Sequence, residues 1–351
     1  VAVGDYHSVI LDDGGNVWVM GGNRSGQLGV GEKLPVRPVK LKGHFTGVFC
    51  GGSSTIIIDN DGYVMGSGYN SFGQMGLGDY NNRTTFVKVP DIKDITSCSA
   101  KINTSILVDV SGSVWVSGLN TKGQLGLGEE YKNVNSFHKL PDIPPMLSAC
   151  TGFSTTLFLD FNGNVWICGE NKYFFNIEDN LESRYWIPKL IPNIPPISQI
   201  SISIYHTLLL DDNGCVWGSG DGDGIPESTR RMGVVNLTET QKLPVAKYCI
   251  AGHGTSFILD IDGLVWCMGT NSHGQLGIGH LRPQTEFKCI DNLPIIATII
   301  TSYTHTLLVD ESGNIWGCGN NNERQLGIMG EKKISKPEII HAIPSVSIQK
   351  A

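Results

Sequence analysis

The sequence predicts an all-β fold: a seven-bladed β-propeller of four-stranded blades, closed by pairing of its N- and C-terminal strands. The first observation is a repeat. The position held by Trp18, Met65 and Trp115 recurs seven times, at spacings of 47, 50, 51, 51, 49 and 50 residues in a chain of 351. The second is that each period contains four short apolar runs and no helical periodicity, the pattern of one propeller blade. A single core rarely grows beyond about 300 residues, so a ring of small sheets also suits the length.

Each repeat has the same order of elements. An apolar run such as residues 105–108 leads into an Asp-x-x-Gly turn such as residues 109–112, and a second run centred on Val-Trp follows. Asp, Asn and Gly accept the backbone angles of a tight turn, so these two runs are predicted to form a β-hairpin. A Gly-rich loop, a Pro-bounded strand such as residues 86–90 and a fourth run such as residues 47–50 complete the repeat.

The two chain ends are predicted to close the ring. Residues 1–4 match the end of a fourth run, and residues 7–11 open the next hairpin. Residues 337–340 and 346–348 match the two strands that precede a hairpin. Each terminus would therefore hold half a blade, and their pairing would leave no open sheet edge in a single domain of residues 1–351.

Composition excludes several classes of protein. With 40% hydrophobic and 17% charged residues, and no apolar run of about 18 residues, the chain fits neither a disordered protein nor a membrane span. A formal net charge of −7 argues against direct DNA binding. The nine Cys lack the spacing of a zinc site, which predicts reduced thiols packed as small apolar residues in an intracellular location, cytoplasmic or nuclear. We expect a monomer.

The Gly-rich loop recurs five times in the same phase. It reads Gly-Gln-Leu/Met-Gly-x-Gly at residues 26–31, 73–78, 123–128 and 274–279, and Arg-Gln-Leu-Gly at residues 324–327. Together with the Val-Trp-x-x-Gly run, these loops resemble the regulator of chromosome condensation (RCC1) repeat family over the whole chain, and the resemblance implies a seven-bladed propeller. As residues, the glycines permit tight bends, the Leu or Met packs between blades, and the Gln amide bonds loop backbone groups.

Two further motifs are assigned to the scaffold. The Asp-x-x-Gly turns recur in every repeat and lack the ligand set of a calcium loop. His7, His206 and His305 share one repeat position, where other repeats carry Ser or Thr, so a hydrogen-bonding slot is favoured over a metal-binding or catalytic role. The sequence has no nucleophile elbow and no phosphate loop. We therefore expect no enzyme activity and no catalytic, cofactor-binding or metal-binding residues.

Repeats four and five lack the Gln-Leu-Gly loop, and the segments that replace it are predicted to form a partner-binding surface. They combine aromatic residues, acids and an Arg pair, a composition typical of interaction hot spots. The candidate residues are Tyr173, Phe174, Phe175, Tyr185, Trp186, Asp221, Asp223, Arg230 and Arg231. The alternative is that two degenerate loops have drifted and their aromatic side chains fold back onto the blade.

Three functions are compared. The first hypothesis is a non-catalytic protein-interaction scaffold, because propellers present loops on rigid faces. The resemblance implies the alternative, guanine-nucleotide exchange on a Ran-type small GTPase or binding to one, and acidic loops suit a basic GTPase surface. Against exchange, the repeat spacings leave little room for the inserted wedge of the family's founding member, and its basic chromatin-binding tail has no counterpart. The ultraviolet-receptor branch implies a Trp cluster, but only Trp186 lies outside the blade position.

Overall fold

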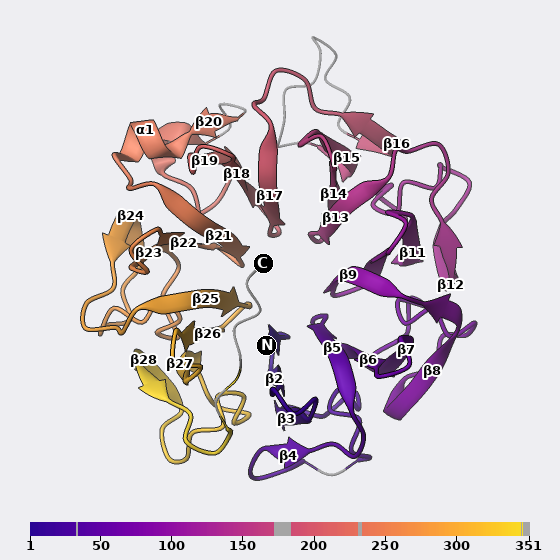
Figure 1. Cartoon of the computed structure of the whole chain (residues 1–351), viewed down its shortest axis with the longest axis horizontal. Coiled ribbons are helices and arrows are strands. Elements are labelled where there is room, and N and C mark those ends of the chain that lie inside the picture. Colours follow the sequence, from indigo (N-terminus) through magenta and orange to yellow (C-terminus); the bar gives the residue numbers. More distant parts are fainter. Residues whose placement is uncertain (33, 172–183, 231–233, 345, 347–351) are drawn as a thin grey trace.

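In the computed structural model, seven four-stranded antiparallel sheets are arranged in a ring around a central axis (Figure 1). The structure describes residues 1–32, 34–171, 184–230, 234–344 and 346. Each sheet is one blade, and its strands follow chain order from the axis to the rim. The predicted all-β, seven-bladed propeller is therefore confirmed.

The first three blades contain the strands of residues 2–139. Blade 1 contains β1 (Ala2–Val3), β2 (His7–Leu11), β3 (Val17–Gly21) and β4 (Val39–Lys40). Blade 2 contains β5 (Phe45–Cys50), β6 (Ser54–Asp59), β7 (Tyr63–Gly68) and β8 (Arg83–Lys93). Blade 3 contains β9 (Ile95–Lys101), β10 (Thr104–Asp109), β11 (Val114–Leu119) and β12 (Asn133–Lys139).

The remaining four blades continue in the same order. Blade 4 contains β13 (Met146–Thr151), β14 (Thr155–Asp160), β15 (Val165–Glu170) and β16 (Arg184–Leu190). Blade 5 contains β17 (Ile197–Ile202), β18 (His206–Asp211), β19 (Val216–Gly220) and β20 (Val235–Asn236). Blade 6 contains β21 (Ala246–Gly252), β22 (Thr255–Asp260), β23 (Val265–Gly269) and β24 (Gln284–Cys289). Blade 7 contains β25 (Ile296–Thr301), β26 (His305–Asp310), β27 (Ile315–Asn320) and β28 (Lys333–Ile339). Among the described residues, the helical segments are the 3₁₀ turn η1 (Glu227–Thr229) and α1 (Leu237–Gln241), both in blade 5.

The hydrophobic core is divided among the junctions between neighbouring blades. At the junction of blades 3 and 4, for example, Val116 of β11 packs with Phe158 of β14 and Cys168 of β15. The second strand of a blade is buried along all of its length, as in β14 and β26, or all but its last residue, as in β10, because both faces of the sheet contact a neighbouring blade. Apolar residues therefore appear on successive positions of this strand as well as on alternating ones.

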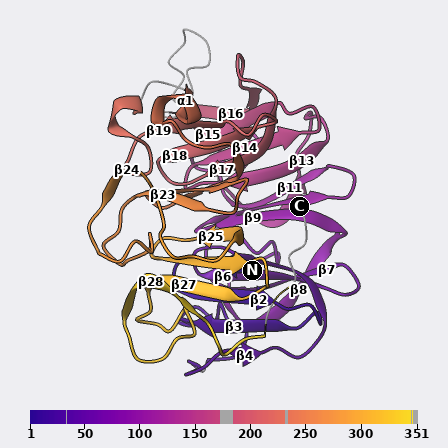
Figure 2. The same ribbon diagram turned by 60° about the vertical axis from the view of Figure 1, so that its left-hand side comes forward.

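Blade 1, built from the first residues of the chain, packs against blade 7 and completes the ring (Figures 1 and 2). Ser8 Oγ donates a hydrogen bond to the carbonyl of Gln325 at 2.7 Å. The equivalent hydroxyl of blade 7, Thr306 Oγ1, donates to the Gln275 carbonyl of blade 6 at 2.8 Å. The contact that joins successive blades elsewhere thus also joins the first blade to the last.

The strand order corrects part of the predicted sharing of one blade between the two chain ends. In the described residues, β1 to β4 form one sheet and β25 to β28 another, so the predicted strand at residues 337–340 falls in blade 7 with its own hairpin. Residues 347 and 348 of the second predicted C-terminal strand lie outside the described residues, so its pairing with the N-terminal strands stays a prediction. The fourth apolar run of each repeat is the innermost strand of the following blade, as β5 is for blade 2. A period of four strands reads the same from any starting strand, so periodicity alone cannot place the blade boundary.

Candidate functional site

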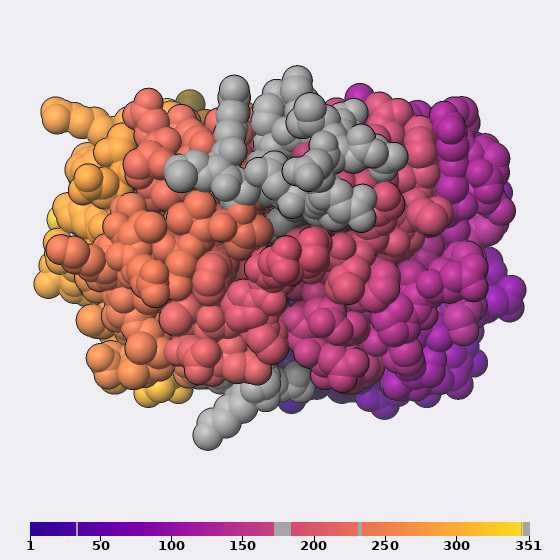
Figure 3. Space-filling model, turned by 90° about the horizontal axis from the view of Figure 1, so that it is seen from above, coloured from indigo at the N-terminus to yellow at the C-terminus, as the bar shows by residue number. Residues whose placement is uncertain are grey.

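The antiparallel order gives the ring two different ends, which lie along the upper and lower edges of the edge-on view in Figure 3. Loops from the first to the second strand and from the third to the fourth strand of each blade emerge at one end, which we call the loop face. Turns from the second to the third strand, and connections from the fourth strand to the next blade, lie at the other end, which we call the turn face.

On the turn face, each Asp of an Asp-x-x-Gly turn is bound within its own hairpin. Asp12 Oδ1 accepts from the N–H of Gly14 (2.9 Å) and of Asn16 (3.0 Å), and Asp12 Oδ2 accepts from Trp18 Nε1 (3.0 Å). The same contact to an indole N–H, at 2.9 to 3.3 Å, recurs at Asp109, Asp160, Asp211, Asp260 and Asp310. Burial raises the pKa of the Asp12 carboxyl, but the hydrogen bonds from Trp18 and Asn16 outweigh it and hold that pKa below its usual value. The predicted structural role of these turns is confirmed.

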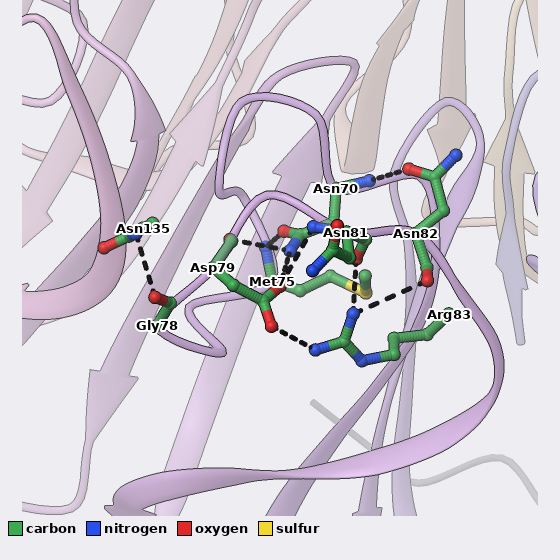
Figure 4. Close-up of polar contacts among 8 residues, drawn as sticks. All are labelled: Asn70, Met75, Gly78, Asp79, Asn81, Asn82, Arg83 and Asn135. Carbon is green, nitrogen blue, oxygen red and sulfur yellow. Dashed lines mark hydrogen bonds and ion pairs between the residues drawn. The ribbon is translucent and has the colours of Figure 1, made fainter.

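On the loop face, an Asn holds each complete Gly-rich loop, as Figure 4 shows for blade 2. Asn70 Oδ1 accepts from the N–H of Met75 at 2.9 Å, and Asn70 Nδ2 donates to the carbonyl of Asp79 at 3.0 Å. The same Asn-to-Leu contact is made by Asn23, Asn120, Asn271 and Asn321. Sequence reasoning missed this Asn, although it precedes the Leu or Met by five residues in all five loops.

The Gln and Gly of the same loop have the predicted scaffold roles. Gln74 Oε1 accepts from the N–H of Phe72 at 3.2 Å, which satisfies a loop donor. Gly73 has a φ of +81°, and a Cβ there would lie 2.5 Å from the Cα of Asn135 in the next blade. This glycine is therefore required both by the left-handed backbone and by the close approach of two blades.

The histidines that share one repeat position bond hydroxyls of the next blade. The pairs are His7 with Thr55, His206 with Ser256 and His305 with Ser8, each at 2.9 Å from Nε2 to oxygen. Thr55 Oγ1 gives its own proton to the carbonyl of Gln27 at 2.6 Å, so His7 Nε2 is the donor in its pair. Burial lowers the pKa of His7 to about 4 and those of His206 and His305 to about 3, so all three imidazoles are neutral at pH 7. The predicted hydrogen-bonding slot is confirmed.

The predicted partner-binding residues of blade 4 divide into buried, partly exposed and undescribed positions. Tyr173, Phe174 and Phe175 lie outside the described residues. Tyr185 of β16 is 3% exposed and belongs to the core cluster between blades 4 and 5, so its side chain packs on the blade. Trp186, the next residue, is partly exposed and points away from that cluster, as alternation along a strand requires.

Two cationic side chains lie over the ring of Trp186. The guanidinium carbon of Arg184 is 5.1 Å from the centroid of the Trp186 ring, and Lys132 Nζ of blade 3 is 5.9 Å from it. Cations at these distances are attracted to the negative face of an indole ring. Near this cluster, Lys122 Nζ and Glu170 Oε1 form a 3.7 Å ion pair between blades 3 and 4.

In blade 5, the predicted residues Asp223 and Arg230 are bonded to each other. Arg230 Nη2 donates to Asp223 Oδ1 at 3.2 Å, and the Arg230 Nε donates to the carbonyl of Ile225 at 3.4 Å. Asp223 is exposed and Asp221 is partly exposed. Arg231 lies outside the described residues. The structure thus places Asp223 and Arg230 together.

A pocket of about 200 Å³ opens on the axis at the loop face, and sequence reasoning did not predict it. Loops between the first and second strands of all seven blades line it. One repeat position, two residues before that of His7, contributes Asp5, Gly52, Ile102, Phe153, Ile204, His253 and Tyr303. The rings of His253 and Tyr303 pack edge to face with their centroids 4.2 Å apart. The pocket is therefore mainly apolar and aromatic, with a few charged groups.

Cysteines and metal-binding groups add no second site. All nine Cys are free thiols, and Cys168, Cys249, Cys267 and Cys318 are buried as predicted. Burial raises the pKa of the Cys318 thiol to about 12, so it is protonated at pH 7. Within the described ranges, no three His, Cys, Asp or Glu side chains gather closely enough to hold a metal ion. Across the same residues, no helix has the length and apolar character to span a bilayer.

Comparison with known proteins supports the repeat assignment. The family model described as "Regulator of chromosome condensation (RCC1) repeat" matches residues 1–27 and 45–74. The "RCC1 domain-containing protein RUG3, mitochondrial" of Arabidopsis thaliana is 31% identical over 153 residues, which cover 42% of this chain and 34% of RUG3. The match thus spans about a third of that relative's length.

Solved structures share the fold. Human WBSCR16 superposes with a TM-score of 0.79 at 20% identity, covering 88% of this chain and 85% of that one. Yeast RCC1 (Prp20), solved bound to Kap60, gives a TM-score of 0.80 at 19% identity, covering 96% and 85%. A second structure, Prp20p from Saccharomyces cerevisiae, gives 0.73 at 18% identity over 86% and 80%, and its description names binding to Gsp1p and histones.

Proposed function

Because the chain carries RCC1 repeats on a seven-bladed β-propeller, we propose that it is a monomeric, non-catalytic scaffold that binds a protein partner through its loop face. The observation that carries this proposal is the loss of the Gly-rich loop in two adjacent blades, 4 and 5, on the face where the other five blades keep it. Beside the altered loop, Trp186 lies partly exposed with Arg184 and Lys132 over its ring. Trp and Arg are the residues most enriched among interface hot spots.

The proposed surface favours an acidic or mixed-charge partner segment at blade 4. Arg184 and Lys132 form no ion pair within the described residues, so a partner carboxylate can approach them. Trp186 adds a large, rigid contact area with little loss of side-chain entropy. On the turn face, by contrast, the turn carboxylates are already bound by their own hairpins.

The test is capture of the partner from extract by the immobilised full chain, quantified for matched variants. Replacing Arg184 and Trp186 together by Ala is expected to reduce capture by at least about tenfold, the loss of roughly 1.4 kcal/mol of binding free energy. Phe161→Ala, an exposed aromatic on the turn face of the same blade, is the control and should leave capture unchanged. Both variants should melt within a few degrees of the parent. Undiminished capture by the Arg184/Trp186 variant contradicts the proposal.

The alternative function is guanine-nucleotide exchange on a Ran-type small GTPase, or binding to one. It is favoured by the likeness of the ring to Prp20 over 96% of this chain, together with the description that links Prp20p to Gsp1p. A Ran-type GTPase loaded with fluorescent GDP separates the two functions. Accelerated GDP release supports exchange, whereas binding without release supports the scaffold. The proposed location is intracellular, and the name of RUG3 places that relative in mitochondria.

A further inference from the structure

Lys101 breaks a repeat position that is small in the other six blades. The equivalent residues, directly after the innermost strand or at its end, are Gly4, Gly51, Gly152, Ser203, Gly252 and Ser302. Five of these six residues, all except Gly252, line the axial pocket together with Lys101, which is the only long side chain at this repeat position. A departure of this kind in one repeat of seven indicates a specific role, because packing of the blade does not require it.

Lys101 lines the axial pocket together with Asp5 of blade 1 and His253 of blade 6. The pocket therefore holds both a cationic and an anionic side chain. Burial lowers the pKa of Lys101, while the nearby Asp5 opposes that shift.

Among the described residues, no carboxylate lies within ion-pair distance of the Lys101 ammonium. Every ion pair found among the described residues joins other side chains, so neither Lys101 nor Asp5 has an opposite charge within 4.0 Å. Lys101 therefore keeps three donors that only water or a ligand can satisfy. A desolvated charge without a partner is unfavourable, and an anion that enters the pocket removes that cost.

The pocket is small enough that its occupant should be about the size of one amino-acid side chain. Its volume of about 200 Å³ is below the range of roughly 300–1,000 Å³ that holds drug-sized ligands and cofactors. Phe153 and Tyr303, 48% and 42% exposed, form an aromatic rim where an apolar neighbour of the inserted group can pack. The space thus suits an anionic side chain followed or preceded by an apolar residue.

The charge balance selects a carboxylate. Lys101 brings one positive charge to the pocket and Asp5 brings one carboxyl group. An inserted carboxylate adds one negative charge beside Asp5, whereas a phosphoryl group adds about 1.5 to 2 at neutral pH, so repulsion from Asp5 disfavours the phosphoryl group more. Asp5 Oδ2 lies against blade 2, where a Cβ added to Gly52 would be 2.8 Å away, so it stands at the pocket wall and can accept N–H groups of an inserted segment.

We propose that the axial pocket is an anchor site that takes one Asp or Glu side chain of a protein partner, with its carboxylate paired to Lys101 and an apolar neighbour against Phe153 and Tyr303. This inference rests on the proposed scaffold function, and it names the chemistry of the partner: an acidic residue next to an aromatic one. The pocket and Trp186 lie on the same face, so one partner can contact both.

The test uses the full chain and two short probes, acetyl-Gly-Phe-Glu-Gly-amide and its Gln counterpart, titrated by ligand-observed NMR. The Glu peptide is expected to bind about tenfold more tightly than the Gln peptide, as for one charge-assisted hydrogen bond. Lys101→Met and Lys101→Ser, the latter copying Ser203 and Ser302, should abolish this preference. Lys42→Met, an exposed Lys on the turn face, should retain it. Melting curves confirm that each variant is folded.

Several results would overturn the proposal. Equal binding of the Glu and Gln peptides would show that no pair forms between the peptide carboxylate and the Lys101 ammonium. An unchanged preference for the Glu peptide after Lys101→Ser would show the same. Tighter binding of free 3-phenylpropionate than of the Glu peptide makes the pocket a small-molecule site. Tighter binding of a third peptide, in which phosphoserine replaces the Glu, makes it a phosphate site. The peptides probe the pocket without the natural partner, so their failure is distinct from a failure of partner capture through Arg184 and Trp186.

Discussion

Lowering the pH from 7 to 5 is expected to destabilise the ring through the buried imidazoles of His7, His206 and His305. Burial lowers the pKa of His7 from 6.5 to about 4, and those of His206 and His305 from 6.5 to about 3. Between pH 6.5 and these values, the unfolded chain binds protons that the folded chain does not. The stabilisation is therefore fully present above the unfolded pKa and is lost as the pH falls towards the folded pKa values.

The size of the effect follows from the same pKa values. At pH 5 an unfolded imidazole is almost fully protonated and a folded one is mostly neutral. The free energy of unfolding is therefore lower at pH 5 than at pH 7 by about 2 kcal/mol for each histidine. The three together cost about 6 kcal/mol, similar to the whole stability of many domains, which is roughly 5–15 kcal/mol. The turn carboxylates do not add to the loss of stability between pH 7 and pH 5. Hydrogen bonds outweigh the effect of burial and hold the pKa of Asp12, for example, below its usual value, so this group stays ionised in that range.

Urea unfolding followed by Trp fluorescence at pH 7 and pH 5 measures this loss. His206→Thr places at this position the residue that Thr155 and Thr255 already supply in blades 4 and 6, and this variant should lose about 2 kcal/mol less than the parent on acidification. His280→Thr, an exposed loop histidine, should lose as much as the parent. The reasoning fails if His206→Thr keeps the full pH dependence, or if NMR shows the His206 imidazole titrating above pH 6.

Three further substitutions test the scaffold contacts. Ser8→Ala should destabilise the chain by about 1–3 kcal/mol, because it leaves the buried carbonyl of Gln325 unpaired at the junction of blades 1 and 7, and an unchanged urea midpoint contradicts that role. Asp211→Ala should lower the free energy of unfolding by about 2 kcal/mol and shift the Trp fluorescence, because Trp217 Nε1 loses its acceptor at 2.9 Å. An unaltered emission spectrum would refute this contact. Gly73→Ala should lower the free energy of unfolding, measured in thermal melts, by more than about 1 kcal/mol, because its φ is +81° and its Cβ would meet the next blade. An unchanged melting temperature would show that the loop can shift to make room for the Cβ.

The repeat made most of the scaffold predictable. Asp109 and Gln124 recur at fixed spacing, and the roles predicted for them depend on contacts within one hairpin or one loop. Local geometry determines such contacts, so one repeat is informative about all. The blade boundary was not predictable, because it depends on which strand lies nearest the axis. That choice is made by packing between blades and leaves no local signal.

The partner-binding prediction was limited for a related reason. Tyr185 and Trp186 are adjacent aromatic residues in one altered repeat, and composition treats them alike. In β16 they point to opposite sides of the sheet, so Tyr185 packs into the core and Trp186 does not. Lys101, by contrast, had a readable signal. Aligning the seven repeats places it against Gly and Ser alone, and this comparison requires no structure.

The places where charged and polar side chains form no bond within the described part of the protein favour the loop face as the functional face. On the turn face, the Asp carboxylates are bound by turn N–H groups and by indoles such as that of Trp18. On the loop face, complete Gly-rich loops are bound by their own Asn and Gln side chains, as around Asn70. Lys101 at the axis and Arg184 and Lys132 beside Trp186 are three cations of blades 3 and 4 on that face that form no ion pair among the described residues. A partner that supplies carboxylates across these two blades can satisfy all three, which the propeller by itself does not.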